Sequence, residues 1–146
     1  MKSRIAPLIF VALISLTAVY APRARGDESG QPASRQKTVK EVGVREARIL
    51  IDEKKGSPGF VILDVRTDEE YSGGHIEGST NIDVKSESFA DEVGKLDKSK
   101  TYLVYCRSGK RSAAAVEIME AEGFTDIYVM PGGILGWQGA GYPVTK

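Results

Sequence analysis

The chain has 146 residues, of which 41% are hydrophobic and 27% charged, a balance typical of one compact globular domain and unlike that of a disordered or fibrous protein. Its formal net charge is zero, but the first 26 residues carry four basic side chains and no acid, so the other 120 residues hold 16 basic and 20 acidic side chains. A mildly acidic domain has no electrostatic basis for binding nucleic acid or an anionic membrane, and an anionic ligand would need a local site.

The first 26 residues have the pattern of an export signal. Lys2 and Arg4 form a basic start, and the apolar run over 5–20 is shorter than the about 20 residues that a membrane span needs. The small residues before Asp27 fit cleavage after Gly26. We therefore predict a signal peptide over 1–26, export to a bacterial periplasm, and no stable membrane association after cleavage. The alternative is an uncleaved anchor helix.

Strands and helices alternate after a polar stretch over 27–37, whose Gly, Pro and Ser residues are typical of a flexible linker. In chain order we expect a strand at 39–42, a helix at 45–55, a strand at 60–63, a short helix capped by Thr67, an extended piece at 79–82, a helix at 89–96, a strand at 101–105, a helix at 111–122, a strand at 127–130 and a short segment at 134–137. This alternation predicts one α/β domain over 38–146, with a mainly parallel sheet flanked by helices.

The chain has a single cysteine, Cys106, so it cannot form an internal disulfide. A buried structural cysteine is one interpretation. However, Cys106 ends the predicted strand at 101–105, and a helix is expected to begin about five residues later. In parallel sheets ligands bind beyond the carboxyl ends of the strands, often at a helix N-terminus, so the position favours a functional thiol.

The residues around Cys106 favour its thiolate form. Arg107, Lys110 and Arg111 place three cations in the loop, and the expected helix points its positive end at the same place. Gly109 allows a backbone conformation that turns successive amides inward as an anion nest. Because each of these features lowers the pKa of a thiol, we predict that Cys106 is largely thiolate at neutral pH.

Two chemistries use a cysteine in such a cradle. A phosphatase loop wraps a phosphoryl group and has five residues between its Cys and Arg, whereas four residues separate Cys106 from Arg111. The tighter loop suits a sulfur atom better than a phosphoryl group. The count therefore favours sulfur transfer, with phosphatase or arsenate reductase activity as the alternative.

Three motifs in the same order resemble those of the rhodanese family, over nearly all of Lys37 to Pro143. The loop Cys-Arg-Ser-Gly-Lys-Arg-Ser at 106–112 is similar to the family's active-site loop. The stretch Leu-Asp-Val-Arg-Thr-Asp-Glu-Glu-Tyr-Ser-Gly-Gly-His-Ile-Glu-Gly-Ser-Thr-Asn-Ile at 63–82 resembles a second family signature, with Ser79 where Ala is usual. Gly132-Gly133 followed by Trp137 resembles the C-terminal motif.

The resemblance implies a sulfurtransferase in which Cys106 accepts a sulfane sulfur from a donor such as thiosulfate, and passes it as a persulfide to cyanide or a thiol. Carried over by position, Cys106 is the catalytic residue. The substrate-binding residues are Arg107, Ser108, Gly109, Lys110 and Arg111. The resemblance implies no metal or organic cofactor, and we expect a monomer. The alternatives are a sulfur carrier loaded by a protein partner, and a sensing module.

Five further residues have supporting interpretations. We expect Asp64 and Arg66 to brace the active-site loop through charged hydrogen bonds, and Glu70 to support the same arrangement. His75 is the only histidine, but its place in the Gly-His-Ile motif favours a structural hydrogen bond near a turn over general-base catalysis. Trp137 is expected in the core or at its rim.

Overall fold

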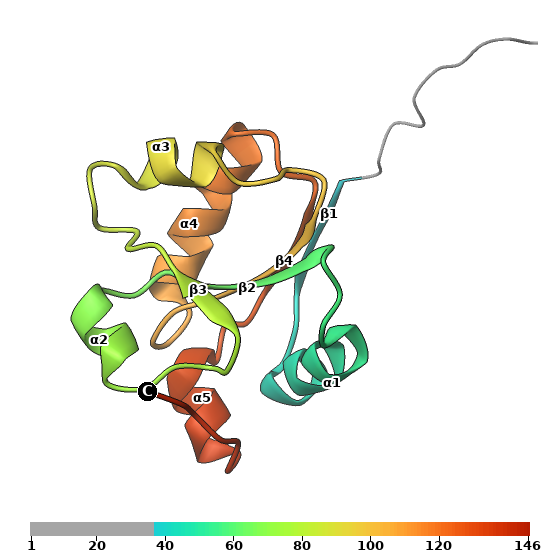
Figure 1. Ribbon diagram of the computed structural model, residues 1–146, viewed down its shortest axis with the longest axis vertical. Coiled ribbons are helices and arrows are strands. Elements are labelled where there is room, and N and C mark those ends of the chain that lie inside the picture. The colour runs from blue at the N-terminus through green and yellow to red at the C-terminus, as the bar shows by residue number, and fades with distance from the viewer. Residues whose placement is uncertain (1–36) are drawn as a thin grey trace, which may run out of the picture. The chain divides into compact units, whose positions relative to one another are not determined.

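A five-stranded sheet forms the centre of the computed structural model, which describes residues 37–146 (Figure 1). The strands are β1 (Thr38–Glu41), β2 (Phe60–Asp64), β3 (Ser79–Asn81), β4 (Thr101–Tyr105) and β5 (Asp126–Val129), in the spatial order β1-β5-β4-β2-β3. Each neighbouring pair is parallel. The predicted α/β class with a mainly parallel sheet is thus confirmed, and β4, which precedes Cys106, is the middle strand.

Helices cover both faces of this sheet. They are α1 (Val44–Lys54), α2 (Asp68–Ser72), α3 (Phe89–Gly94), α4 (Lys110–Ala121) and α5 (Gly133–Gly139). Figure 1 shows α3 and α4 on one side of the sheet and α1 and α5 on the other. Each predicted element is present with its ends shifted by up to a few residues; the helix predicted at 111–122, for example, runs from Lys110 to Ala121.

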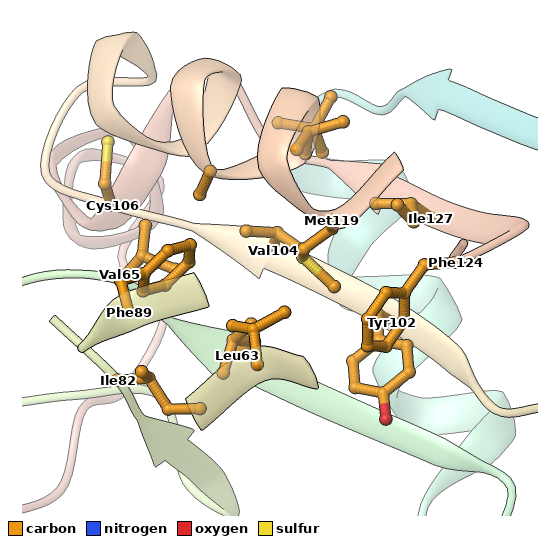
Figure 2. Packing of buried hydrophobic residues seen from close by; sticks show 14 residues of the cluster. Leu63, Val65, Ile82, Phe89, Tyr102, Val104, Cys106, Met119, Phe124 and Ile127 are labelled. Atoms are coloured by element: carbon orange, nitrogen blue, oxygen red, sulfur yellow. The ribbon is translucent and has the colours of Figure 1, made fainter. Parts of the chain in front are cut away.

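The alternation of side chains along β4 divides the core into two clusters. Tyr102 and Val104 pack on the face covered by α3 and α4, and Leu103 and Tyr105 pack on the face covered by α1 and α5. Because successive strand residues point to opposite faces, the side chain of Cys106 lies on the same face as those of Tyr102 and Val104. Figure 2 shows its side chain in that cluster, at the end of β4.

The parallel arrangement brings three loops to one edge of the sheet. The carboxyl ends of β2, β4 and β5 lie side by side, so the loops that follow them meet there. These loops contain Asp64 to Thr67, Cys106 to Gly109, and Met130 to Gly132. The residues of the three motifs therefore lie together at this edge, although Asp64 and Gly132 are 68 positions apart along the chain.

The predicted leader over 1–26, and the predicted linker over 27–37 except its last residue, lie outside the described residues. Within 37–146, no helix combines the length and apolar character needed to cross a bilayer. In the same part of the chain, no three His, Cys, Asp or Glu side chains come together as ligands for a metal ion.

Candidate active site

Cys106 lies between the end of β4 and the start of α4, and its side chain is 1% exposed. In Figure 2 it lies next to Val65 and Phe89, which belong to the same apolar cluster. Gly109 is the N-cap residue of α4, so the amide end of the helix faces the loop. We call residues 106–111 the cysteine loop.

Backbone amides and one hydroxyl surround the sulfur. The Gly109 amide donates a hydrogen bond to Sγ of Cys106 at 3.1 Å. Burial acts to raise the pKa of this thiol, but the Ser112 hydroxyl and the amides of Ser112, Ser108 and Gly109 outweigh it, so the pKa lies below its usual value. The sequence predicted this direction. The main causes are the amides and the hydroxyl, with the side chains of Arg107 and Lys110 exposed to solvent.

Two glycines allow the cysteine loop to pack closely against the loop that follows β5. Gly109 has a φ of 93°, and an added Cβ would overlap the Pro131 carbonyl oxygen. Gly133 has a φ of 55°, and a Cβ there would overlap the carbonyls of Cys106 and Arg107. Those carbonyls accept hydrogen bonds from the first turn of α5, with Ile134 N donating to Cys106 O at 2.8 Å. Because α5 binds the carbonyl groups of the cysteine loop, the amide groups of that loop are free to point towards Sγ of Cys106.

Glu70 connects the cysteine loop to α2. Its carboxylate accepts two hydrogen bonds from the Arg111 guanidinium, at 2.6 and 2.7 Å, and the two side chains are 30% and 22% exposed. Glu70 also forms a capping box with Thr67 at the start of α2. The Arg111 hydrogen bond, against the opposing effect of burial, lowers the pKa of Glu70 to about 2. The two hydrogen bonds fix the orientation of the Arg111 guanidinium, and the negative charge of Glu70 offsets most of its positive charge.

Asp64 and Arg66 form a second, fully buried ion pair. The Arg66 guanidinium donates to both Asp64 carboxylate oxygens at 2.6–3.0 Å, and also to the Gly74 carbonyl at 2.8 Å. The prediction that this pair braces the cysteine loop directly needs correction. The pair holds the turn after α2, and it is connected to the loop through α2 and its residue Glu70. The reason is geometric, because the Asp64 carboxylate accepts hydrogen bonds from the backbone amide and the guanidinium of Arg66, two residues further along the chain.

His75 and Trp137 have the structural roles that the sequence favoured. Nδ1 of His75 lies 3.0 Å from the Tyr71 carbonyl, and the His75 ring stacks on the Tyr71 ring at 3.7 Å. Trp137 is 2% exposed, and its indole N–H donates to the Pro143 carbonyl at 2.8 Å. The Nδ1 atom and ring face of His75 and the indole N–H of Trp137 thus make local contacts, as expected for structural residues.

The sequence singled out the cysteine loop but missed two of the residues that shape it. Ser112, whose side chain is fully buried, donates its hydroxyl to the Gly109 carbonyl at 2.8 Å. The sequence signal that could have indicated this contact is the position of Ser112 three residues after Gly109, the N-cap residue of α4. Gly133 was noted only as part of a motif, and its contact with the cysteine loop depends on the tertiary packing of α5.

A cleft of about 390 Å³ lies away from Cys106, between the C-terminal part of α1 and α5. Ile51, Phe60 and Trp137 form part of its apolar lining, and Lys54 and Lys55 lie at the end of α1 beside it. Cys106 does not line this cleft.

The fold and the site define an α/β domain with a buried, hydrogen-bonded thiol at the end of its middle strand, and comparison with known proteins gives its family. The chain belongs to the Rhodanese-like domain family, which matches residues 27–140. It is 34% identical, over 58% of its length and 75% of the relative's, to thiosulfate sulfurtransferase GlpE of Pseudomonas entomophila. It is 32% identical to the thiosulfate:glutathione sulfurtransferase of Saccharomyces cerevisiae, covering 60% of this chain and 70% of that one.

A solved structure agrees with the family assignment. The rhodanese-related protein from Thermoplasma volcanium superposes with a TM-score of 0.61 at 32% identity, over 73% of this chain and 97% of that one. Family membership, together with the curated relatives, makes this chain an enzyme of the rhodanese-type sulfurtransferase class.

Proposed function

We propose that this enzyme takes the sulfane sulfur of thiosulfate onto Cys106 as a persulfide and delivers it to a thiol or to cyanide. The proposal rests above all on one observation: Sγ of Cys106 is held by the Gly109 amide at the N-terminus of α4, where its pKa is lowered. The names of the relatives from Pseudomonas entomophila and Saccharomyces cerevisiae support thiosulfate as donor, and the second supports a thiol as acceptor.

The two half-reactions can be written with their charges balanced. In loading, the Cys106 thiolate attacks the outer sulfur of thiosulfate; the new S–S bond forms as the old one breaks, and sulfite leaves with the electron pair. In discharge, the acceptor anion attacks the outer persulfide sulfur, and the electron pair of the broken bond returns to Sγ. The lowered pKa of Cys106 supplies the thiolate for loading and improves the same sulfur as a leaving group in discharge.

We propose that the cysteine loop binds the donor. Arg107, Ser108 and Lys110 are exposed on this loop, the Gly109 amide donates to Sγ of Cys106, and Arg111 interacts with Cys106 electrostatically. Dianionic thiosulfate would be attracted by the two exposed cations and by the amides of α4. The four-residue spacing from Cys106 to Arg111 favours a sulfur atom over a phosphoryl group in this space.

The test is thiocyanate production from thiosulfate and cyanide. The wild type should turn over, and Cys106→Ser should lose all activity while it keeps the circular dichroism spectrum of the wild type. As a matched control, Ser72→Ala changes an exposed side chain at the end of α2 and should be unaffected. Residual turnover in Cys106→Ser would contradict the mechanism. A wild type that turns over only when a protein partner supplies the sulfur would be a relay, and the proposal for thiosulfate would be wrong.

We propose that residues 1–26 direct export and are removed after Gly26, which would place the enzyme in a bacterial periplasm. The support is the basic start and the short apolar run of this segment. Expression of the full chain in a bacterium, followed by fractionation and N-terminal sequencing, tests this. A mature N-terminus at Asp27 in the periplasmic fraction is expected, and an intact N-terminus retained in the membrane would contradict it.

We also propose that the enzyme acts as a monomer on small molecules. Among the described residues, the large exposed hydrophobic side chains are Val39, Ile49, Leu135 and Val144. They come from different elements, whereas a stable interface usually presents a contiguous apolar patch. Size-exclusion chromatography with light scattering should give the mass of one chain, and a concentration-independent dimer would contradict this.

A further inference from the structure

The cleft between α1 and α5 is lined by none of the residues of the cysteine loop, and its lining is mostly apolar. Its volume of about 390 Å³ lies in the range of small-molecule sites. Ile51 and Phe60 are half-buried, so part of each side chain is open to a ligand. The apolar lining comes from α1, β2, the turn before β3 and the C-terminal segment, and consists of Ile51, Phe60, Ile62, Ile76, Trp137 and Pro143.

The spacing of residues along α1 explains why charged side chains meet this apolar surface. One face of the helix holds positions i, i+3, i+4 and i+7, which here are Arg48, Ile51, Asp52 and Lys55. All four line the cleft, and so does Lys54, three residues after Ile51. Because α1 ends at Lys54, the two lysines lie together at the end of the helix.

The charged groups at the cleft carry an excess of one positive charge, since Arg48, Lys54 and Lys55 face only Asp52 and Glu77. Arg48 is paired with Asp52 at 2.8 Å. Lys55 lies 3.8 Å from Glu77, and these side chains are 75% and 81% exposed, which makes the pair weak. Lys54 makes no ion pair within residues 37–146. The end of α1 therefore offers an uncompensated positive charge beside an apolar surface.

We propose that this cleft binds a small amphipathic carboxylate, whose apolar chain lies against Ile51 and Phe60 and whose carboxylate is held by Lys54 and Lys55. A single negative charge matches the excess of one positive charge, and removal of the apolar chain from water supplies most of the binding free energy. A cation of the same size lacks a free partner, because both carboxylates at the cleft are already paired. The site is separate from the sulfur chemistry, since Cys106 does not line it.

A second, smaller cleft provides a comparison within the same molecule. It has a volume of about 210 Å³ and lies between α1 and the strands β1 and β5. Its charged residues are Lys40, Glu46 and Glu53, which give an excess of one negative charge. A carboxylate should therefore select the cleft at Lys54. A charge change at Lys40 serves as the matched control for the same change at Lys54.

Trp137 makes binding measurable in the protein without a label. It is the only tryptophan of the chain, it lines the cleft, and its indole N–H donates to Pro143, which also lines it. The full-length protein is titrated with octanoate, and binding is followed by tryptophan fluorescence and by calorimetry. Octanol and octylamine are the neutral and cationic ligands of equal chain length. We expect saturable binding of octanoate with a dissociation constant below about 1 mM, weaker binding of octanol, and no saturable binding of octylamine.

Two variants test the two parts of the site. Lys54→Glu should raise the dissociation constant of octanoate by about three- to tenfold, because a weak attraction becomes a repulsion. Lys40→Glu, the same change at the second cleft, should leave it unchanged, and neither variant should alter the binding of octanol. Ile51→Ala should weaken octanoate and octanol alike, because it removes apolar contact. Saturating thiosulfate should not displace octanoate.

Four results would overturn the inference: octylamine binding as tight as that of octanoate, equal effects of Lys54→Glu and Lys40→Glu, displacement of octanoate by thiosulfate, or no octanoate binding at millimolar concentration. If circular dichroism shows that Ile51→Ala does not fold, the lysine variants and the three ligands still decide, since they change only a charge or the ligand. None of these results depends on a persulfide at Cys106, so this failure is distinguishable from failure of the proposed function.

Discussion

The two ion pairs near the active edge of the sheet use the same chemistry in different surroundings. Asp64–Arg66 joins residues two positions apart and is almost completely buried, with side chains 0% and 6% exposed. Glu70–Arg111 joins residues 41 positions apart and is open to solvent by about a quarter of its surface. The first pair is part of the framework, because neither partner can lose the other without leaving a buried charge. The Glu70–Arg111 pair lies at the site and is partly exposed, so solvent and a bound ligand can change the strength of its interaction.

Breaking the buried pair should have the largest effect on stability. Asp64→Ala leaves the Arg66 guanidinium in the interior with a hydrogen bond to the Gly74 carbonyl but no opposite charge to replace Asp64, and we expect a loss of about 3–5 kcal/mol in the free energy of unfolding. Denaturant unfolding followed by circular dichroism measures it. Asp64→Asn, which keeps the shape and some hydrogen bonding, should lose less. A loss below about 1 kcal/mol for Asp64→Ala would show that burial does not distinguish the two pairs.

Removing the charge of Glu70 should lower the free energy of unfolding by less than Asp64→Ala does. Glu70→Gln keeps the Thr67 hydroxyl as acceptor for the residue 70 amide but loses the ion pair, so we expect about 1–2 kcal/mol, between values for exposed pairs and for charged hydrogen bonds. Arg111 would also be released from its fixed direction, and the apparent KM for thiosulfate should rise. Glu69→Gln on the same helix is the matched control and should leave both quantities unchanged. Equal effects from the two variants would contradict the role of the pair.

The same pair should show a characteristic pH dependence. The pKa of Glu70 is lowered from its ordinary value of 4.5 to about 2, so the ionised form is favoured in the folded protein. Its contribution to stability is then complete above about pH 4.5 and is lost as the pH falls towards about 2. The difference in unfolding free energy between wild type and Glu70→Gln should disappear over that window. A difference that stayed at its full neutral-pH size down to pH 2 would mean that it has a source other than ionisation.

The ion pair Arg48–Asp52 on α1 is more exposed than the other two, and it extends the comparison to pairs that contribute least to stability. Its atoms are 2.8 Å apart at the i,i+4 spacing, but the side chains are 35% and 52% exposed. Asp52→Asn should therefore change the unfolding free energy by about 0.5 kcal/mol or less. A measurement in high salt should remove even that difference. A loss as large as that of Glu70→Gln would break the ranking by burial.

Local patterns were sufficient to predict the fold. The apolar runs that became β2 and β4, the breakers between elements, and Thr67 as a helix cap all depend on nearby residues, and each was confirmed. The strand-loop-helix position of Cys106 was predictable for the same reason. Boundaries moved by a residue or more because hydrogen bonding decides the end of a helix; α4, for example, takes Gly109 as its cap and begins at Lys110.

The contacts that complete the site could not be predicted, because they join segments far apart in the chain. Glu70 was expected to support the arrangement, but its partner Arg111 follows only from the packing of α2 beside α4. The contact of Gly133 with the carbonyls behind Cys106 likewise depends on where α5 lies. Ser112 was quoted in the motif, yet a serine in the first turn of a helix is common, and only its burial marks it as unusual.

Intact-mass measurement tests the central claim, that Cys106 carries the sulfur, most directly. Wild-type protein treated with thiosulfate and freed of donor should gain the mass of one sulfur atom, and cyanide should return it to the starting mass with formation of thiocyanate. Cys106→Ser should gain nothing under the same conditions. A gain of sulfur by Cys106→Ser, or a wild type whose mass does not change with thiosulfate although the protein is folded, would contradict the account.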